Sequence, residues 1–240
     1  MPQQQVGLKS HSLSGTNEHF LDPNSDCCRV WQRRLTQRKK MNVMKNSHIG
    51  NAGRTFGSAV TSLKSGVALL LLAAATLTAQ AGTDNRAPEV PDVISVGDTN
   101  KVSFHGFGVG FQVYTWNGTS WGGAIPDATL YDEDGNVVAL HFGVFDANGR
   151  FVGPAWQSNS GSTVVGKLPP AAIIINTDAI PWLRLAPLST EGPGVFADTT
   201  FIQRVNTIGG KSPSTNGTFV GQVARVPYTA DYFFYRSVKN

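Results

Sequence analysis

From Lys101 onward the chain alternates short runs of β-branched and aromatic residues with turn residues, and this alternation constrains its fold most strongly. Two of the turns, Asn117-Gly118 and Asp134-Gly135, suit the positive φ angles of tight hairpins. Outside a short turn expected near 173–178, helical periodicity never lasts more than two turns. The pattern predicts strands at 102–104, 111–116, 128–131, 137–142, 151–156, 163–167, 182–186, 201–207, 222–226 and 232–236.

Ten short strands joined by close turns predict an all-β fold, as a single antiparallel β-sandwich or a small β-barrel. An internal similarity supports consecutive hairpins, because residues 131–138 match residues 145–152 at an offset of 14. The domain is expected over 101–240, preceded by an extended arm over 82–100 that contains two prolines.

An apolar run of 15 residues, 67–81, precedes this domain. A membrane-spanning helix needs about 20 residues, so the run fits the core of a secretory signal peptide better than an anchor. It ends in Ala-Gln-Ala, a small-residue cleavage motif, which predicts cleavage between Ala81 and Gly82. We therefore expect export to the periplasm or the exterior, with no membrane anchor after removal of the signal.

The signal peptide is expected over 41–81, beginning at Met41 or Met44. Residues 1–40 are then either an unusually long leader or a consequence of a start placed too far upstream at Met1.

Cleavage at this point changes the charge of the protein. Residues 1–81 carry ten Lys and Arg against three acids, whereas residues 82–240 carry ten against thirteen. The basic surplus belongs to the leader and gives no reason to expect a nucleic-acid partner. Cys27 and Cys28 also lie in the leader, so the exported part has no disulfide, thiol nucleophile or Cys metal ligand.

Two glycine motifs match enzymes by letter but not by context. The G-x-S-x-G of residues 118–122 lacks the following helix of a nucleophile elbow, and we interpret it as a hairpin tip. The glycines of 106–110 lack the helix that binds a dinucleotide phosphate, and we interpret them as a bend or bulge between strands. We assign no catalytic residue and no cofactor.

The sequence signals for a metal site are similarly weak. Asp132 begins a turn with alternating oxygen donors, but its glycine comes at position four, whereas an EF-hand loop needs it at position six. His105 and His141 are 36 residues apart and have no thiolate partner. We assign no metal site.

Polar residues within apolar strands need partners or a ligand. On this basis Trp156, His141, Arg204 and Asp231 are the candidate ligand-contact residues, with aromatic faces forming part of a cleft. Two structural alternatives remain open: an ion pair between Arg204 and Asp231 that joins two strands, and ordinary core packing of the aromatic residues.

The leading functional hypothesis is a non-enzymatic binding or envelope/surface module for a small molecule, a glycan or an envelope component. The rival is a hydrolase or isomerase that uses His141 with Asp231 or Asp132. Contact between His141 and a carboxylate favours the enzyme, and burial of His141 against backbone carbonyls opposes it. A third hypothesis is self-assembly through an exposed edge strand at 201–207.

The C-terminal half carries distinctive motifs, including IPWLRL at 180–185, FIQRVNTIGG at 201–210 and VPYTADYFFYR at 226–236. Together with PDATLYD at 126–132, GPAW at 153–156 and VVGK at 164–167, these resemble the family called domain of unknown function 3455. The resemblance implies an exported protein and no particular catalytic role. Family members often carry two cysteines where this chain has 114–116 and 216–218, which implies a dispensable disulfide. The hairpin at 144–152 is also longer than the family's usual linker.

Overall fold

The computed structural model describes residues 86–238, so the predicted leader and cleavage site lie outside the described residues. The described chain is almost entirely β, with one short 3-10 turn, η1 (Asp92–Ile94). Its strands are β1 (Asn100–Thr115), β2 (Ile125–Tyr131), β3 (Val137–Phe145), β4 (Phe151–Ser158), β5 (Thr163–Gly166), β6 (Ala171–Ile173), β7 (Trp182–Leu185), β8 (Pro187–Glu191), β9 (Thr199–Gly209) and β10 (Val223–Ser237).

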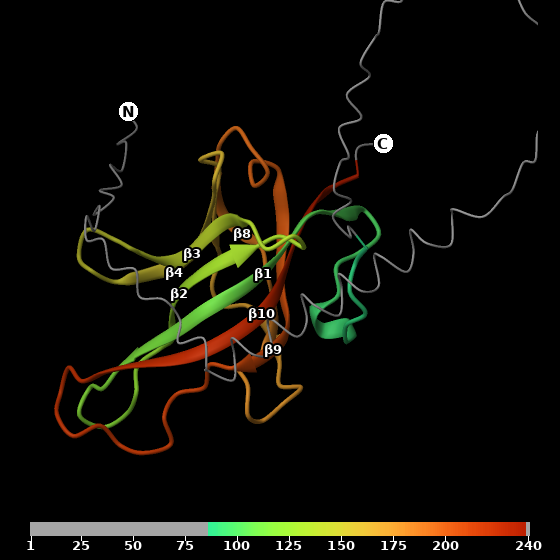
Figure 1. The fold of residues 1–240 in the computed structure, drawn as a ribbon. Coiled ribbons are helices and arrows are strands. Elements are labelled where there is room, and N and C mark those ends of the chain that lie inside the picture. The colour runs from blue at the N-terminus through green and yellow to red at the C-terminus, as the bar shows by residue number, and fades with distance from the viewer. Residues whose placement is uncertain (1–85, 239–240) are drawn as a thin grey trace, which may run out of the picture.

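All ten strands join in one antiparallel sheet with the order β6-β7-β9-β10-β1-β2-β3-β4-β5-β8. The sheet curls into a half-barrel (Figure 1), and the all-β antiparallel prediction is confirmed. No helix within 86–238 has the length and apolar character needed to span a bilayer.

The similarity between 131–138 and 145–152 corresponds to two consecutive hairpins, β2–β3 and β3–β4. Asp132 accepts backbone hydrogen bonds from residues 134 and 136, and Asp146 accepts the equivalent pair from residues 148 and 150. Each carboxylate therefore closes its own turn.

The prediction that 201–207 forms an exposed edge strand is wrong. These residues belong to β9, which pairs with β10 on one side and with β7 on the other. The backbone groups of β9 are therefore largely used within the sheet, and the self-assembly hypothesis loses its candidate edge.

The interpretation of the 106–110 glycines as a bend between strands is also wrong. They lie inside the single long strand β1, whose register shift falls earlier, between Val102 and Phe104. Their role is to leave space: a Cβ at Gly108 would lie 2.5 Å from the ring of Tyr232. A Cβ at Gly110 would lie 2.3 Å from the carbonyl oxygen of Asp127. The Tyr232 ring of β10 can therefore lie over β1 at Gly108, and the backbone of β2 can approach β1 closely at Gly110.

The concave face of the sheet carries the larger core, and it positions the candidate site. Successive residues of a strand point to opposite faces, so alternate positions of β10 supply this core. Its buried aromatic members are Trp156, Phe196, Tyr228, Tyr232 and Phe234.

The convex face is covered by the segment that precedes β1. Ile94 is fully buried there against Val205 and Phe233. The segment is also tied by polar contacts, since Gln203 Nε2 donates to the carbonyl of Ile94 at 2.6 Å and Arg184 donates to that of Ser95. The convex face is therefore sealed, and only the concave face is left open for a pocket.

Candidate ligand pocket

A pocket of about 180 Å³ opens on the concave face of the half-barrel. One wall comes from β1 to β4, and the other comes from β7 and β9. The segment 168–170, which has a cis peptide bond between Leu168 and Pro169, also borders it. The lining residues are Gln112, Ala124, Pro126, His141, Phe151, Pro154, Trp156, Leu168, Pro170, Leu183, Leu185, Arg204 and Tyr232.

Arg204 is the only charged residue in this lining. It lies on β9 opposite Leu183 of β7 and Tyr232 of β10. Its Nε and Nη2 donate to the carbonyl oxygen of Pro181 at 3.3 and 2.9 Å, which fixes one edge of the guanidinium. Within residues 86–238 it forms no ion pair with a carboxylate, so the pocket has an uncompensated positive charge.

Three tyrosine hydroxyls lie close enough to Arg204 to feel its charge. The hydroxyls of Tyr228 and Tyr232 lie 3.0 Å apart, and that of Tyr114 donates to the carbonyl oxygen of Gly210 at 2.6 Å. Burial raises the pKa of Tyr232, and the nearby Arg204 opposes that rise only in part. The phenols are therefore neutral at physiological pH and act as hydrogen-bonding groups.

His141 and Trp156 form a stacked pair from neighbouring positions on β3 and β4, with ring centroids 4.2 Å apart and an interplanar angle of 7°. The Nδ1 of His141 lies 2.8 Å from the carbonyl oxygen of Ala155. Burial lowers the pKa of His141 to about 3, assisted by Arg204 and opposed by the hydrogen bond to Ala155. His141 is thus neutral at physiological pH.

A neutral imidazole has one N–H, and a carbonyl oxygen only accepts, so the proton of His141 must be on Nδ1. This assignment leaves Nε2 as an acceptor with a free lone pair. The indole Nε1 of Trp156 is buried and has no hydrogen-bond acceptor within the described chain. The pocket therefore combines apolar walls with a cation and a neutral acceptor, whereas the unused indole donor is buried away from the pocket space.

The structure brings three of the four predicted contact residues together, since Trp156, His141 and Arg204 all line this pocket. Asp231 does not line it. Tyr232 is the register partner of Arg204, so Asp231, one position earlier, points to the convex face. There it accepts a hydrogen bond of 2.7 Å from Asn206 Nδ2. Arg204 and Asp231 accordingly do not form the ion pair considered from the sequence.

The carboxylates of the enzyme hypothesis lie elsewhere. Asp132 is engaged within its own turn, where it accepts hydrogen bonds from Asn136, and Asp231 lies on the opposite face. His141 is instead buried against the carbonyl of Ala155, which is the arrangement that opposes a His–carboxylate pair. No group of three potential metal-ligating side chains occurs within residues 86–238.

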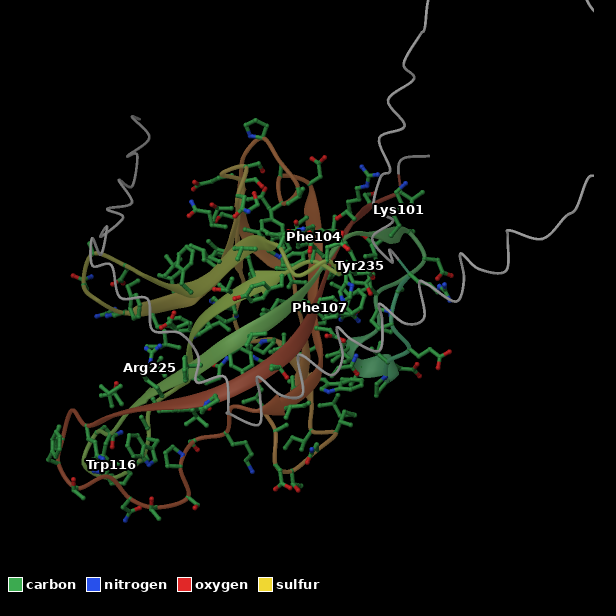
Figure 2. The ribbon with its side chains drawn as sticks, viewed as in Figure 1. Lys101, Phe104, Phe107, Trp116, Arg225 and Tyr235 are labelled. Atoms are coloured by element: carbon green, nitrogen blue, oxygen red, sulfur yellow. The ribbon has the colours of Figure 1, made fainter. Side chains whose placement is uncertain are left out.

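The serine of the G-x-S-x-G motif lies in an exposed hairpin tip, as expected. Among the described residues, Ser120 exchanges hydrogen bonds only with Asn117 across the loop, its backbone N–H donating to Asn117 Oδ1 at 2.8 Å and its hydroxyl accepting from Asn117 Nδ2 at 3.2 Å. Nearby, Trp121 donates to the carbonyl of Thr215. Trp116, at the start of this tip, is labelled at the far end of the β1–β10 ribbon in Figure 2.

Sequence reasoning missed Gln112, Tyr232 and the wall residues of β7. The spacing of Tyr228 and Tyr232 in β10 shows that they share a face. What the sequence lacks is the register that places this face opposite Arg204.

A family model described as "Protein of unknown function (DUF3455)" matches residues 97–236. The chain belongs to this family. The match begins just before β1, ends within β10 and contains every residue that lines the pocket. No curated protein and no solved structure matches the chain.

The DUF3455 resemblance also associates two stretches of this chain with a cysteine pair, and the structure brings these stretches into contact. A Cβ at Gly217 would lie 2.4 Å from Cγ of Trp116. In this member a Trp ring packed over a glycine occupies the region.

Proposed function

We propose that this DUF3455 protein is an exported, non-enzymatic binding protein that holds a small organic molecule in the concave pocket. The observation that carries the proposal is the pocket itself, with apolar walls and a few convergent polar groups, a combination common in ligand sites. Its volume of about 180 Å³ is similar to the roughly 150 Å³ cavity that accommodates benzene in an engineered protein. The ligand is therefore about the size of one substituted ring.

Export is supported by the apolar run over 67–81 and the Ala-Gln-Ala that ends it. The test is N-terminal sequencing of the protein recovered outside the cytoplasm. A mature chain that begins at Gly82 supports export with cleavage after Ala81. Retention of the whole chain in the cytoplasm contradicts it.

Binding is tested by a thermal-shift screen of the purified protein against small aromatic and aliphatic compounds. A ligand at one hundred times its dissociation constant stabilises the native state by about 2.7 kcal/mol. Leu183→Trp should abolish the shift, because the larger ring would occupy the pocket beside Leu185. Leu188→Trp is the matched control, since Leu188 is exposed on β8 and does not line the pocket.

A compound that stabilises the wild type and Leu188→Trp but not Leu183→Trp supports the proposal. If no compound stabilises a cooperatively folding protein, or if every shift persists in Leu183→Trp, the pocket is not a binding site.

A further inference from the structure

The charge of the pocket restricts the molecule it can hold. Arg204 is the sole charged lining residue, and no carboxylate within 86–238 pairs with it. A cation among apolar walls costs free energy unless a counter-charge accompanies it. A single guanidinium balances a monoanion, whereas a phosphate dianion would remain half compensated.

The guanidinium of Arg204 has no anionic partner, and its shape favours a planar anion. The edge formed by Nε and Nη2 donates to the carbonyl of Pro181, which holds the plane of the group in place. The guanidinium also hydrogen-bonds with the neutral hydroxyl of Tyr232, and no carboxylate of the described chain pairs with it. Two parallel N–H groups match the two oxygens of a carboxylate, and this is the geometry in which arginine binds such groups most specifically.

His141 adds a second requirement. His141 lines the pocket and its Nδ1–H is committed to the carbonyl of Ala155, so the ring nitrogen that remains for a ligand is the acceptor Nε2. A ligand therefore gains a hydrogen bond there only if it brings a donor, such as a hydroxyl. The proline and leucine side chains of the wall, Pro126, Pro154, Leu183 and Leu185, surround the space between these two groups.

We infer that the pocket binds a small hydroxy-monocarboxylate with a compact apolar body, its carboxylate on Arg204 and its hydroxyl on His141. This inference rests on the proposed function, because it specifies the chemistry of the same site. No bond is made or broken in it.

The test is isothermal titration calorimetry with four probes of similar size: 4-hydroxybenzoate, benzoate, 4-hydroxybenzamide and phenol. We expect 4-hydroxybenzoate to bind about ten- to one-hundred-fold more tightly than 4-hydroxybenzamide, since charge-assisted hydrogen bonds are stronger than neutral ones. Benzoate should bind less tightly than 4-hydroxybenzoate because it leaves the acceptor of His141 unpaired.

Variants assign the selectivity to its residue. Arg204→Gln should remove the preference for carboxylate over carboxamide, and Arg204→Lys should restore part of it. Arg225→Gln is the matched control, because it removes the same charge from an exposed ion pair with Asp127 that lies outside the pocket lining (Figure 2). Its probe affinities should equal those of the wild type.

The comparison of probes on the wild-type protein decides the inference even if Arg204→Gln does not fold. Equal affinity for carboxylate and carboxamide overturns the anion assignment while leaving the pocket a binding site. Equal affinity for benzoate and 4-hydroxybenzoate overturns the role of His141. If none of the four probes binds but another compound of the screen does, the inference is overturned and the proposed function stands. If no compound of the screen binds, the proposed function is overturned as well.

Discussion

The position of the Tyr232 ring over β1 depends on a single glycine, Gly108. Gly108 lies where a Cβ would meet the Tyr232 ring at 2.5 Å, and Tyr232 borders the pocket. Its backbone is not in the left-handed region, so the absence of a side chain rather than conformational freedom is what the site requires. The glycine therefore helps to set the shape of the pocket.

Gly108→Ala should lower the free energy of unfolding by about 1–3 kcal/mol, because overpacking of a well-packed core forces side chains or backbone to shift. Gly123→Ala is the control, since nothing lies within 4 Å of its Cβ position. Chemical denaturation measures both. Equal stability of the two variants would show that Tyr232 moves aside without cost.

His141 should make stability depend on pH. Its pKa is about 3 in the folded protein, below the ordinary histidine value of 6.5, so the unfolded chain binds the proton more readily. The stabilisation is fully present above about pH 6.5 and is lost as the pH falls toward 3. Each pH unit in this window should cost about 1.4 kcal/mol.

The measurement is urea denaturation between pH 7 and pH 4, comparing the wild type with His141→Gln. Glutamine keeps a hydrogen-bond donor for the carbonyl of Ala155 but does not titrate. We expect a shallower pH dependence in the variant, whatever its absolute stability. Identical slopes would mean that His141 is not buried in its neutral form.

The sequence could identify Trp156, His141 and Arg204 because each is a polar or flat aromatic side chain within an apolar strand. The sequence could not exclude Asp231 from the pocket, because a shift of one position decides which face of the sheet a strand residue occupies. β9 and β10 also contain a register shift between Thr229 and Asp231. Asn206, in the facing part of β9, has a φ of 52°, an irregularity that no periodicity rule predicts.

At the level of elements, local turn chemistry predicted the hairpins, and long-range pairing escaped prediction. The Asp-containing turns after β2 and β3 follow directly from their residues. The pairings β5–β8 and β7–β9 join strands that are not consecutive, and nothing in either strand's own sequence specifies its partner. This is why 201–207 was predicted at an edge although it lies inside the sheet.

The segment before β1 should contribute to stability as an element of the convex core. Ile94→Ala should lower the free energy of unfolding by about 2–5 kcal/mol, because Ile94 is fully buried against Val205 and Phe233. Val93→Ala, at the exposed neighbouring position, should change it by no more than about 0.5 kcal/mol. Thermal unfolding of both variants provides the test, and similar losses would show that the segment does not seal the core.

At the level of the whole molecule, the curl of one sheet brings distant strands to a common site. The pocket takes residues from β4, near one end of the strand order, and from β7, near the other. Composition and strand signals were enough to predict the all-β class. The curl arises from the full set of strand pairings and from side chains such as Phe196 and Leu185 that fill the concave face, so only the assembled sheet defines it.

This architecture predicts how protection from hydrogen exchange is distributed. In the absence of ligand, amides of β1 and β10 should exchange most slowly, because they lie between other strands and carry core residues on both faces. Amides of β6 and β8, at the two ends of the strand order, should exchange fastest. A pocket ligand should then slow exchange in both walls at once, in β3 and β4 and in β7 and β9, since it contacts both and stabilises their shared curvature. Protection gained in one wall alone, measured by exchange with mass spectrometry, would show that the ligand binds to a single wall and that the half-barrel does not respond as a unit.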